Sequence, residues 1–270
     1  MPHKYLTVEG IATWLHHRGP TTLPEVPPDL SRGQALLCLH GEGGNGAEFD
    51  AVLDRLAERH SPLAVDLPAH GRSAGLDSLP GIEAMAEFVG GVAQKLGLGP
   101  HVAVGHSLGG IVAQVHALEH PDALRGLVLI GAGASGGVPA ELLERWRLVS
   151  QGKRRRAFPR ELYAPDAPRE VLGRGFAEWI KTDPRALYGD LLALARFAGT
   201  LERLPALAVP CLSVVGEHEP DWVRESVSAL TRALPAAKHV VISGAGHQVP
   251  IEQPEALADA IAAFVEELPR

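Results

Sequence analysis

The feature that most constrains the fold of this chain is a serine between two glycines at residues 105–109, which read Gly-His-Ser-Leu-Gly. A mostly apolar run at 101–104 precedes it and predicts a buried strand, and the apolar spacing of 110–118 predicts a helix behind it. A turn this tight holds the serine in a strained backbone conformation, and side chains at the flanking positions would collide with neighbouring backbone. The pattern is typical of a nucleophile elbow, in which the Ser107 hydroxyl points outward in front of a helix N-terminus.

Strand and helix patterns alternate on both sides of this turn. The residues at 5–8 and 11–16 flank Glu9-Gly10 and predict an N-terminal β-hairpin. Further strands are predicted at 35–39, 62–66, 125–130, 211–215 and 239–242, and further helices at 49–57, 82–96, 222–234 and 255–268. Because strands that alternate with helices form parallel sheets with right-handed crossovers, we expect an α/β fold. Its centre is a mostly parallel twisted sheet with helices on both faces.

Composition supports this fold and excludes several function classes. Hydrophobic residues make up 46% of the 270 and aromatic residues only 5%, which suits aliphatic strands that are buried on both faces. A net charge of −7 provides no field that would gather phosphates, so nucleic acid is not an expected partner.

The N-terminus lacks a signal-peptide pattern and no apolar run is long enough for a membrane span. Cys38 and Cys211 lie in apolar runs as small buried hydrophobes. We therefore expect a cytoplasmic protein with no membrane partner, either a monomer or a homodimer.

The stretch from 135 to 204 breaks the alternation. It has no convincing strand pattern, and helical spacing occurs around 141–149, 169–181 and 184–197. We predict a helical cap at 135–204 over a core domain made of residues 1–134 and 205–270. Trp146 and Trp179, with nearby phenylalanines and leucines, would form an apolar roof for medium-sized, uncharged or weakly polar acyl groups.

Polar residues follow several strands at the edge where parallel sheets bind ligands, the carboxyl ends. Ser107 follows one strand, a group of acids (Glu217, Glu219 and Asp221) follows another, and His247 follows the last. A serine hydroxyl needs a base to take its proton, and that base needs a carboxylate to hold its tautomer. The order serine, acid, histidine therefore predicts a catalytic triad with Ser107 as nucleophile and His247 as base.

A developing oxyanion also needs fixed N–H donors. The backbone N–H of Leu108 follows the nucleophile, and the glycine loop after His40 offers the N–H of Glu42 as a second donor. We expect the Glu42 side chain to point to solvent or to cap the next helix. His40, which orders this loop, and His106, beside the nucleophile, are placed at the substrate pocket.

Four motifs resemble those of the α/β-hydrolase superfamily. They are His40-Gly41-Glu42-Gly43, Asp66 to Ser73 with the D-x-x-x-H-G-x-S pattern, Gly105 to Gly110, and Gly246-His247 with the following residues. The resemblance covers essentially the whole chain and is closest to carboxylesterases and lactonases with a helical cap. The usual acid of the family is an aspartate three residues after the strand-ending glycine. Glu219 holds that position and is assigned the role, with Asp221 as the fallback.

The resemblance implies hydrolysis of a small-molecule carboxylic ester or lactone through an acyl-enzyme, with no cofactor. No spacing of the 13 histidines fits a metal site, so we expect no metal. One alternative is hydrolysis of a carbon–carbon bond in a dienoate or β-diketone, which needs a basic group near Ser107. The basic run Lys153 to Arg156 is the candidate source of that group. A ligand receptor with little turnover is the alternative from another class.

Overall fold

The computed structural model describes residues 3–20, 23, 25–234 and 236–269. Its eight-stranded sheet has the order β1-β2-β4-β3-β5-β6-β7-β8. The strands are β1 His3–Val8, β2 Ile11–His17, β3 Ala35–Leu39, β4 Ser61–Val65, β5 His101–His106, β6 Leu124–Ile130, β7 Cys211–Gly216 and β8 Lys238–Ile242. Strands β3 to β8 pair in parallel, whereas the hairpin β1–β2 and the pair β2–β4 are antiparallel. The predicted mostly parallel sheet and the N-terminal hairpin are confirmed.

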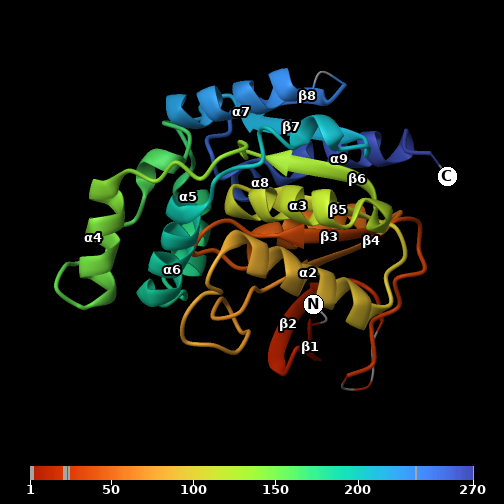
Figure 1. Ribbon diagram of the computed structural model, residues 1–270, viewed down its shortest axis with the longest axis horizontal. Coiled ribbons are helices and arrows are strands. Elements are labelled where there is room, and N and C mark those ends of the chain that lie inside the picture. Colours follow the sequence, from red (N-terminus) through yellow and green to blue (C-terminus); the bar gives the residue numbers. More distant parts are fainter. Residues whose placement is uncertain (1–2, 21–22, 24, 235, 270) are drawn as a thin grey trace.

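Helices cover both faces of this sheet (Figure 1). The α-helices are α1 Asp50–Leu56, α2 Ile82–Leu96, α3 Leu108–Glu119, α4 Ala140–Ser150, α5 Arg169–Trp179, α6 Pro184–Arg196, α7 Asp221–Ala233, α8 Val249–Glu252 and α9 Pro254–Glu266. Side chains of a strand alternate between the two faces, and β3 shows this directly. Leu37 and Leu39 join the core cluster under α2 and α3, while Leu36 and Cys38 join the cluster under α1 and α9. The central strand β3 is therefore buried on both faces, as the aliphatic composition predicts.

The segment 135–204, which the structure describes in full, contains α4, α5, α6 and a short 3-10 helix, Arg160–Leu162, with no strand. In Figure 1 these helices lie together beyond the carboxyl end of β6. Arg156, a member of the basic run, contacts the C-terminal end of α5. Its guanidinium donates to the carbonyls of Trp179 and Thr182, the latter at 2.7 Å. It also lies 3.7 Å from the centre of the Trp179 ring. Arg156 thus satisfies carbonyl groups that the end of a helix leaves unpaired.

Both cysteines are buried and unpaired, Cys38 in β3 and Cys211 in β7. Burial raises the pKa of the Cys211 thiol to about 12, so this side chain behaves as a small apolar group. Among the described residues, none of the helices combines the length and the apolar character that crossing a membrane requires.

Candidate active site

The elbow at Ser107 joins β5 to α3. Ser107 has φ +50° and ψ −116°, a region that residues with a side chain rarely adopt. Its N–H donates to the Ile130 carbonyl at 2.8 Å, which fixes the turn to β6. A Cβ added at Gly105 would lie 2.3 Å from the Gly109 oxygen, and one added at Gly109 would lie 2.3 Å from the Leu39 oxygen. The predicted reason for both glycines, collision with backbone, is therefore confirmed.

A continuous line of side-chain contacts leads from Ser107 to Glu219. The Ser107 Oγ lies 3.1 Å from the His247 Nε2, and the His247 Nδ1 bonds to the Glu219 Oε1. The second oxygen of Glu219 accepts the Gly216 N–H at 3.0 Å, so both carboxylate oxygens are held. His247 and Glu219 are 1% and 3% exposed. Asp221 is instead an exposed residue at the start of α7, and no hydrogen bond of the described chain joins it to His247.

The loop that carries His247 is bonded to the 135–204 segment. The His247 N–H donates to the Leu162 carbonyl at 2.8 Å. The carboxylate of Glu252 accepts the N–H of Gly246 at 2.9 Å and the N–H of Ala164 at 2.7 Å. The position of the histidine therefore depends on residues 162–164 as well as on the sheet. No signal in the sequence pointed to this role of Glu252.

His106 forms a buried ion pair beside the nucleophile. Its Nδ1 lies 3.1 Å from the Glu48 Oε1, and its Nε2 lies 2.9 Å from the His247 carbonyl oxygen. Both partners are acceptors, so both ring nitrogens donate and the ring is an imidazolium. Burial alone would lower the pKa of His106, but Glu48 and the two hydrogen bonds raise it to about 9. His106 lines the cavity in front of Ser107, and its second bond fixes the backbone of the catalytic histidine candidate.

His40 does not line that cavity, and its placement at the substrate pocket was wrong. The ring is fully buried beneath the loop. Its Nδ1 donates to the Gly41 carbonyl at 2.8 Å, and its Nε2 accepts the Leu67 N–H at 3.1 Å. Burial lowers its pKa, which agrees with a neutral ring that donates on one side and accepts on the other. His40 therefore orders the loop by joining it to the end of β4.

The glycine loop after β3 is shaped by contacts with helix α6. The Gly44 N–H donates to the Gly41 carbonyl at 3.0 Å, which closes a tight turn. Gly43 has φ +62°, and a Cβ added there would lie 2.7 Å from the Leu187 Cδ1. The Gly43 N–H donates to the Asp190 Oδ2 at 2.8 Å. Glu42 of this loop and Leu108, the first residue of α3, both line the same cavity, and the Leu108 N–H has no partner within its own helix.

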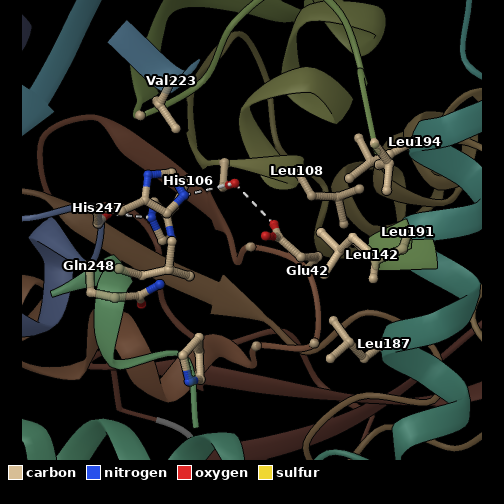
Figure 2. Close-up of a pocket in the computed structure, with 18 of the residues that line it drawn as sticks. Glu42, His106, Leu108, Leu142, Leu187, Leu191, Leu194, Val223, His247 and Gln248 are labelled. Atoms are coloured by element: carbon tan, nitrogen blue, oxygen red, sulfur yellow. Dashed lines mark hydrogen bonds between the residues drawn. The ribbon is translucent and has the colours of Figure 1, made fainter. Parts of the chain in front are cut away.

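The side chain of Glu42 overturns our expectation that it points to solvent or caps a helix. The Ser107 hydroxyl donates to the Glu42 Oε2 at 3.0 Å. The side chain of Asn45 already caps the following 3-10 helix, Gly46–Phe49, by accepting the Ala47 N–H at 3.0 Å. The cap position is therefore occupied, and the turn at 41–44 leaves the carboxylate of residue 42 facing the elbow. Ser107 thus contacts both Glu42 and His247, which lie apart from each other in Figure 2.

A second buried cluster lies behind the loop and was missed by the sequence analysis as a unit. Asp190 of α6 is fully buried and accepts hydrogen bonds from three groups: the His70 Nε2 at 2.9 Å, the Ser78 hydroxyl at 2.5 Å and the Gly43 N–H. Burial works against a charge on His70, but the Asp190 carboxylate raises its pKa overall. His70 also contacts the Pro68 carbonyl of its own turn at 3.0 Å, and its Asp190 partner lies 120 residues away in the chain.

The site opens into a cavity of about 390 Å³. Trp146 and Trp179 line it, as predicted, and leucines form one wall: Leu142, Leu187, Leu191 and Leu194. Trp222, which the sequence analysis did not single out, also lines the cavity. Trp222 is 61% exposed, and the centre of its ring lies 6.1 Å from that of His247. Trp222 lies on the outward face of the amphipathic helix α7, so its place in the sequence pattern resembled that of any surface residue. Among the described residues no cluster of three or more His, Cys, Asp or Glu is arranged to hold a metal.

Comparison with known proteins identifies the family of this chain. The model of the "Alpha/beta hydrolase family" matches residues 36–260. The chain belongs to this family. It is 30% identical over 247 residues to the pimeloyl-[acyl-carrier protein] methyl ester esterase of Yersinia pseudotuberculosis serotype O:1b, with 86% of this chain and 93% of that protein covered.

Two solved structures are similar over nearly the whole chain. The thermophilic esterase of Thermogutta terrifontis has a TM-score of 0.84 and 26% identity, with 99% of each chain covered. The enol-lactonase of Burkholderia xenovorans LB400 has a TM-score of 0.80 at 20% identity, covering 97% of this chain and 100% of that one, and so supports the fold. The prediction of a carboxylic ester hydrolase is confirmed as a reaction class.

Proposed function

We propose that the protein hydrolyses small carboxylic esters or lactones through an acyl-enzyme on Ser107. The observation that carries this proposal is the line of contacts from the Ser107 hydroxyl through His247 to Glu219. In this scheme His247 is the base, and Glu219, rather than Asp221, holds its tautomer and stabilises the imidazolium. Both groups are shielded from water, which strengthens their interaction with the reacting atoms.

The reaction proceeds in two halves. The His247 Nε2 takes the Ser107 proton while Oγ attacks the ester carbonyl, and the same proton then passes to the departing alcohol. The backbone N–H groups of Leu108 and Glu42 donate to the oxyanion that forms on the carbonyl oxygen. Water, deprotonated by His247, then attacks the acyl-enzyme and releases the acid. No cofactor takes part in this scheme.

The 135–204 segment acts as a cap in this proposal. Its tryptophans and the leucine wall enclose an apolar cavity, which suits a medium-sized acyl chain. His106 is a positioning residue, because its bond to the His247 carbonyl holds the histidine loop. The Yersinia relative is named as a methyl ester esterase, so methyl esters are sensible first substrates.

The alternative of carbon–carbon bond hydrolysis needs a basic group that faces an anionic substrate near the nucleophile. None of the residues 153–156, all described, lines the cavity, and Arg156 is used by the end of α5. Arg145 of α4 does line the cavity, but no hydrogen bond or ion pair of the described residues joins it to Ser107. The charged side chain that contacts Ser107 is instead the Glu42 carboxylate. These observations favour esters. A receptor without turnover stays an alternative that activity measurements decide.

The experiment is hydrolysis of short p-nitrophenyl esters by four proteins. Ser107→Ala should reduce kcat/KM by about 10⁴-fold or more, as loss of a triad nucleophile does. Glu219→Gln should reduce it by on the order of 10³ to 10⁴-fold because the histidine loses its orienting carboxylate. Asp221→Asn is the matched control at an exposed acid and should stay within about twofold of the unaltered protein. Undiminished activity of Ser107→Ala, or a larger loss in Asp221→Asn than in Glu219→Gln, would overturn the proposal or its choice of acid.

A further inference from the structure

One feature of this site is not required for ester hydrolysis by a serine triad. It is a carboxylate in contact with Ser107. The Glu42 Oε2 accepts the Ser107 hydroxyl at 3.0 Å, and the side chain is half-buried. None of the ion pairs found among the described residues includes Glu42. Glu42 is therefore a carboxylate beside the reacting atoms that has no ion-pair partner among the described residues.

The other charges that line the cavity do not form an ion pair with Glu42, although the His106 imidazolium attracts it from a distance. Glu48 and His106 form an ion pair with each other, and Glu178 bonds to Lys181 and to the amide of Asn45. Glu161 adds a further acid at an exposed position, and Arg145 of α4 is the remaining basic residue in the lining. Neither forms an ion pair with another described residue.

This arrangement poses two chemical problems for an ordinary neutral ester. The Ser107 hydroxyl has one proton, and while it is donated to Glu42 it cannot be donated to the His247 Nε2. In addition, the carboxylate repels the negative charge that develops on the oxyanion. A positively charged group of the substrate, placed against Glu42, would remove both obstacles. It would pair with the carboxylate, leave the hydroxyl proton to His247, and cancel the repulsion.

The geometry also indicates which part of the substrate carries that charge. The leaving alcohol must lie on the His247 side, because His247 supplies its proton. The Ser107 Oγ contacts Glu42 and His247, and Figure 2 shows Glu42 away from His247, next to the leucine wall formed by Leu142, Leu187, Leu191 and Leu194. A group that meets Glu42 therefore belongs to the acyl part, close to the carbonyl, and the apolar wall receives the chain beyond it.

We propose that the site selects acyl groups that carry an ammonium group close to the ester carbonyl and an apolar chain beyond it, and discriminates against acyl groups with a carboxylate at that position. Esters of apolar amino acids have this chemistry. The inference rests on the proposed ester hydrolysis at Ser107 and defines its substrate class.

Three methyl esters with one carbon skeleton test this inference. Leucine methyl ester carries the ammonium group, methyl 4-methylpentanoate has hydrogen in its place, and monomethyl isobutylmalonate has a carboxylate there. At pH 6.5 the amine is mostly protonated, since an α-amino group has a pKa of about 7.7–8.0. Each ester is compared between the unaltered protein and Glu42→Gln, so differences in intrinsic reactivity cancel. The substitution preserves the size of the side chain and an acceptor for the Ser107 hydroxyl while it removes the charge.

We expect Glu42→Gln to lower kcat/KM for leucine methyl ester at least tenfold relative to the neutral ester, and to raise it at least tenfold for the malonate ester. Glu161→Gln removes one charge from the same cavity without a contact to Ser107, and should shift these ratios less than threefold. Equal changes for all three esters in Glu42→Gln would overturn the inference, as would a preference of the unaltered protein for the malonate ester.

Failure of the proposed function has a different signature, because then no p-nitrophenyl ester is hydrolysed either. In that case binding of the cation is measured directly. Isopentylammonium chloride should raise the Tm of the unaltered protein, relative to sodium chloride of the same concentration, and should not raise that of Glu42→Gln. Equal shifts in the two proteins would contradict the assignment of a cation site to Glu42.

Discussion

His106 and Glu48 form the charged pair that connects the elbow to the histidine loop. The imidazolium is fully enclosed, and both of its donors are used, one by Glu48 and one by the backbone of His247. Removing one member of such a pair leaves the other as a buried charge without a partner, which costs about 3–5 kcal/mol. The free energy of unfolding should therefore depend on the protonation of His106.

The expected pH dependence follows from the pKa of about 9 for His106 in the folded protein, against 6.5 for an unperturbed histidine. Between these values the folded state binds more protons than the unfolded state, so the stabilisation is complete below pH 6.5 and is lost as the pH rises through 9. His16, whose pKa is also raised to about 9, acts in the same direction. We predict that the Tm falls by on the order of 5 °C between pH 6.5 and 9.5, measured by circular dichroism.

Glu48→Gln separates the contribution of His106 from that of His16. Without the carboxylate the ring is no longer held as an imidazolium, so the decline of Tm over this range should be shallower. Glu225→Gln, at an exposed position of α7, should keep the slope of the unaltered protein. An identical slope in all three proteins would contradict the assigned charge of His106.

Single residues differ in how far the sequence predicts their positions. Ser107, His247 and Glu219 follow strands of one parallel sheet, so chain order alone predicts that they meet, and the structure brings them together. Their catalytic roles stay predictions until variants are measured. The direction of the Glu42 side chain could not be predicted, because it depends on Asn45 occupying the helix cap and on the closed turn at 41–44.

Helix α6 is the element that connects the predicted cap to the glycine loop. Asp190 provides the buried contact to Gly43 and to the turn that contains His70, and Leu187 packs against the same loop. If the Glu42 N–H belongs to the oxyanion hole, the position of α6 influences how well this donor is aimed.

We predict that Asp190→Asn lowers kcat for p-nitrophenyl esters by about tenfold or more, with a smaller change in KM. The amide has one acceptor oxygen where the carboxylate has two, so it cannot serve His70, Ser78 and Gly43 together. The measurement is steady-state kinetics with a thermal melt of each protein. Asp183→Asn is the control in the same helix, because asparagine caps a helix N-terminus as well as aspartate does, and it should leave kcat unchanged. A folded Asp190→Asn protein with unaltered kcat would limit Asp190 to a structural role.

Elements of the sheet and its flanking helices were predictable because their periodicity is local. The spacing of apolar residues located α2 over 82–96 and placed β3 over 35–39, as the structure has them. The helices of 135–204 were also located, but their contacts with the core were not. Those contacts depend on polar pairs such as Asp190 with His70, whose partners are far apart in the chain and show no periodicity.

Across the complete described chain, three segments meet at Ser107: the glycine loop after β3, the elbow after β5 and the histidine loop after β8. The glycine loop is bonded to Asp190 and the histidine loop to Leu162, and both of these residues belong to the helical segment 135–204. The elbow is connected to that segment indirectly, through its contacts with the two loops. The predicted core and the predicted cap therefore contact each other directly, through polar groups at the site. Motion of the 135–204 segment would change how these loops are held, while the proposed chemistry depends on Ser107 as the nucleophile.

Covalent labelling tests the role of Ser107 most directly. An organophosphate ester such as diethyl p-nitrophenyl phosphate transfers its phosphoryl group to an activated serine and leaves a stable adduct. We predict one adduct per chain, located on Ser107 by peptide mass spectrometry, that accumulates in parallel with the loss of esterase activity and does not form in Ser107→Ala. Loss of activity without modification of Ser107, or the same labelling in Ser107→Ala, would contradict the assignment of the nucleophile.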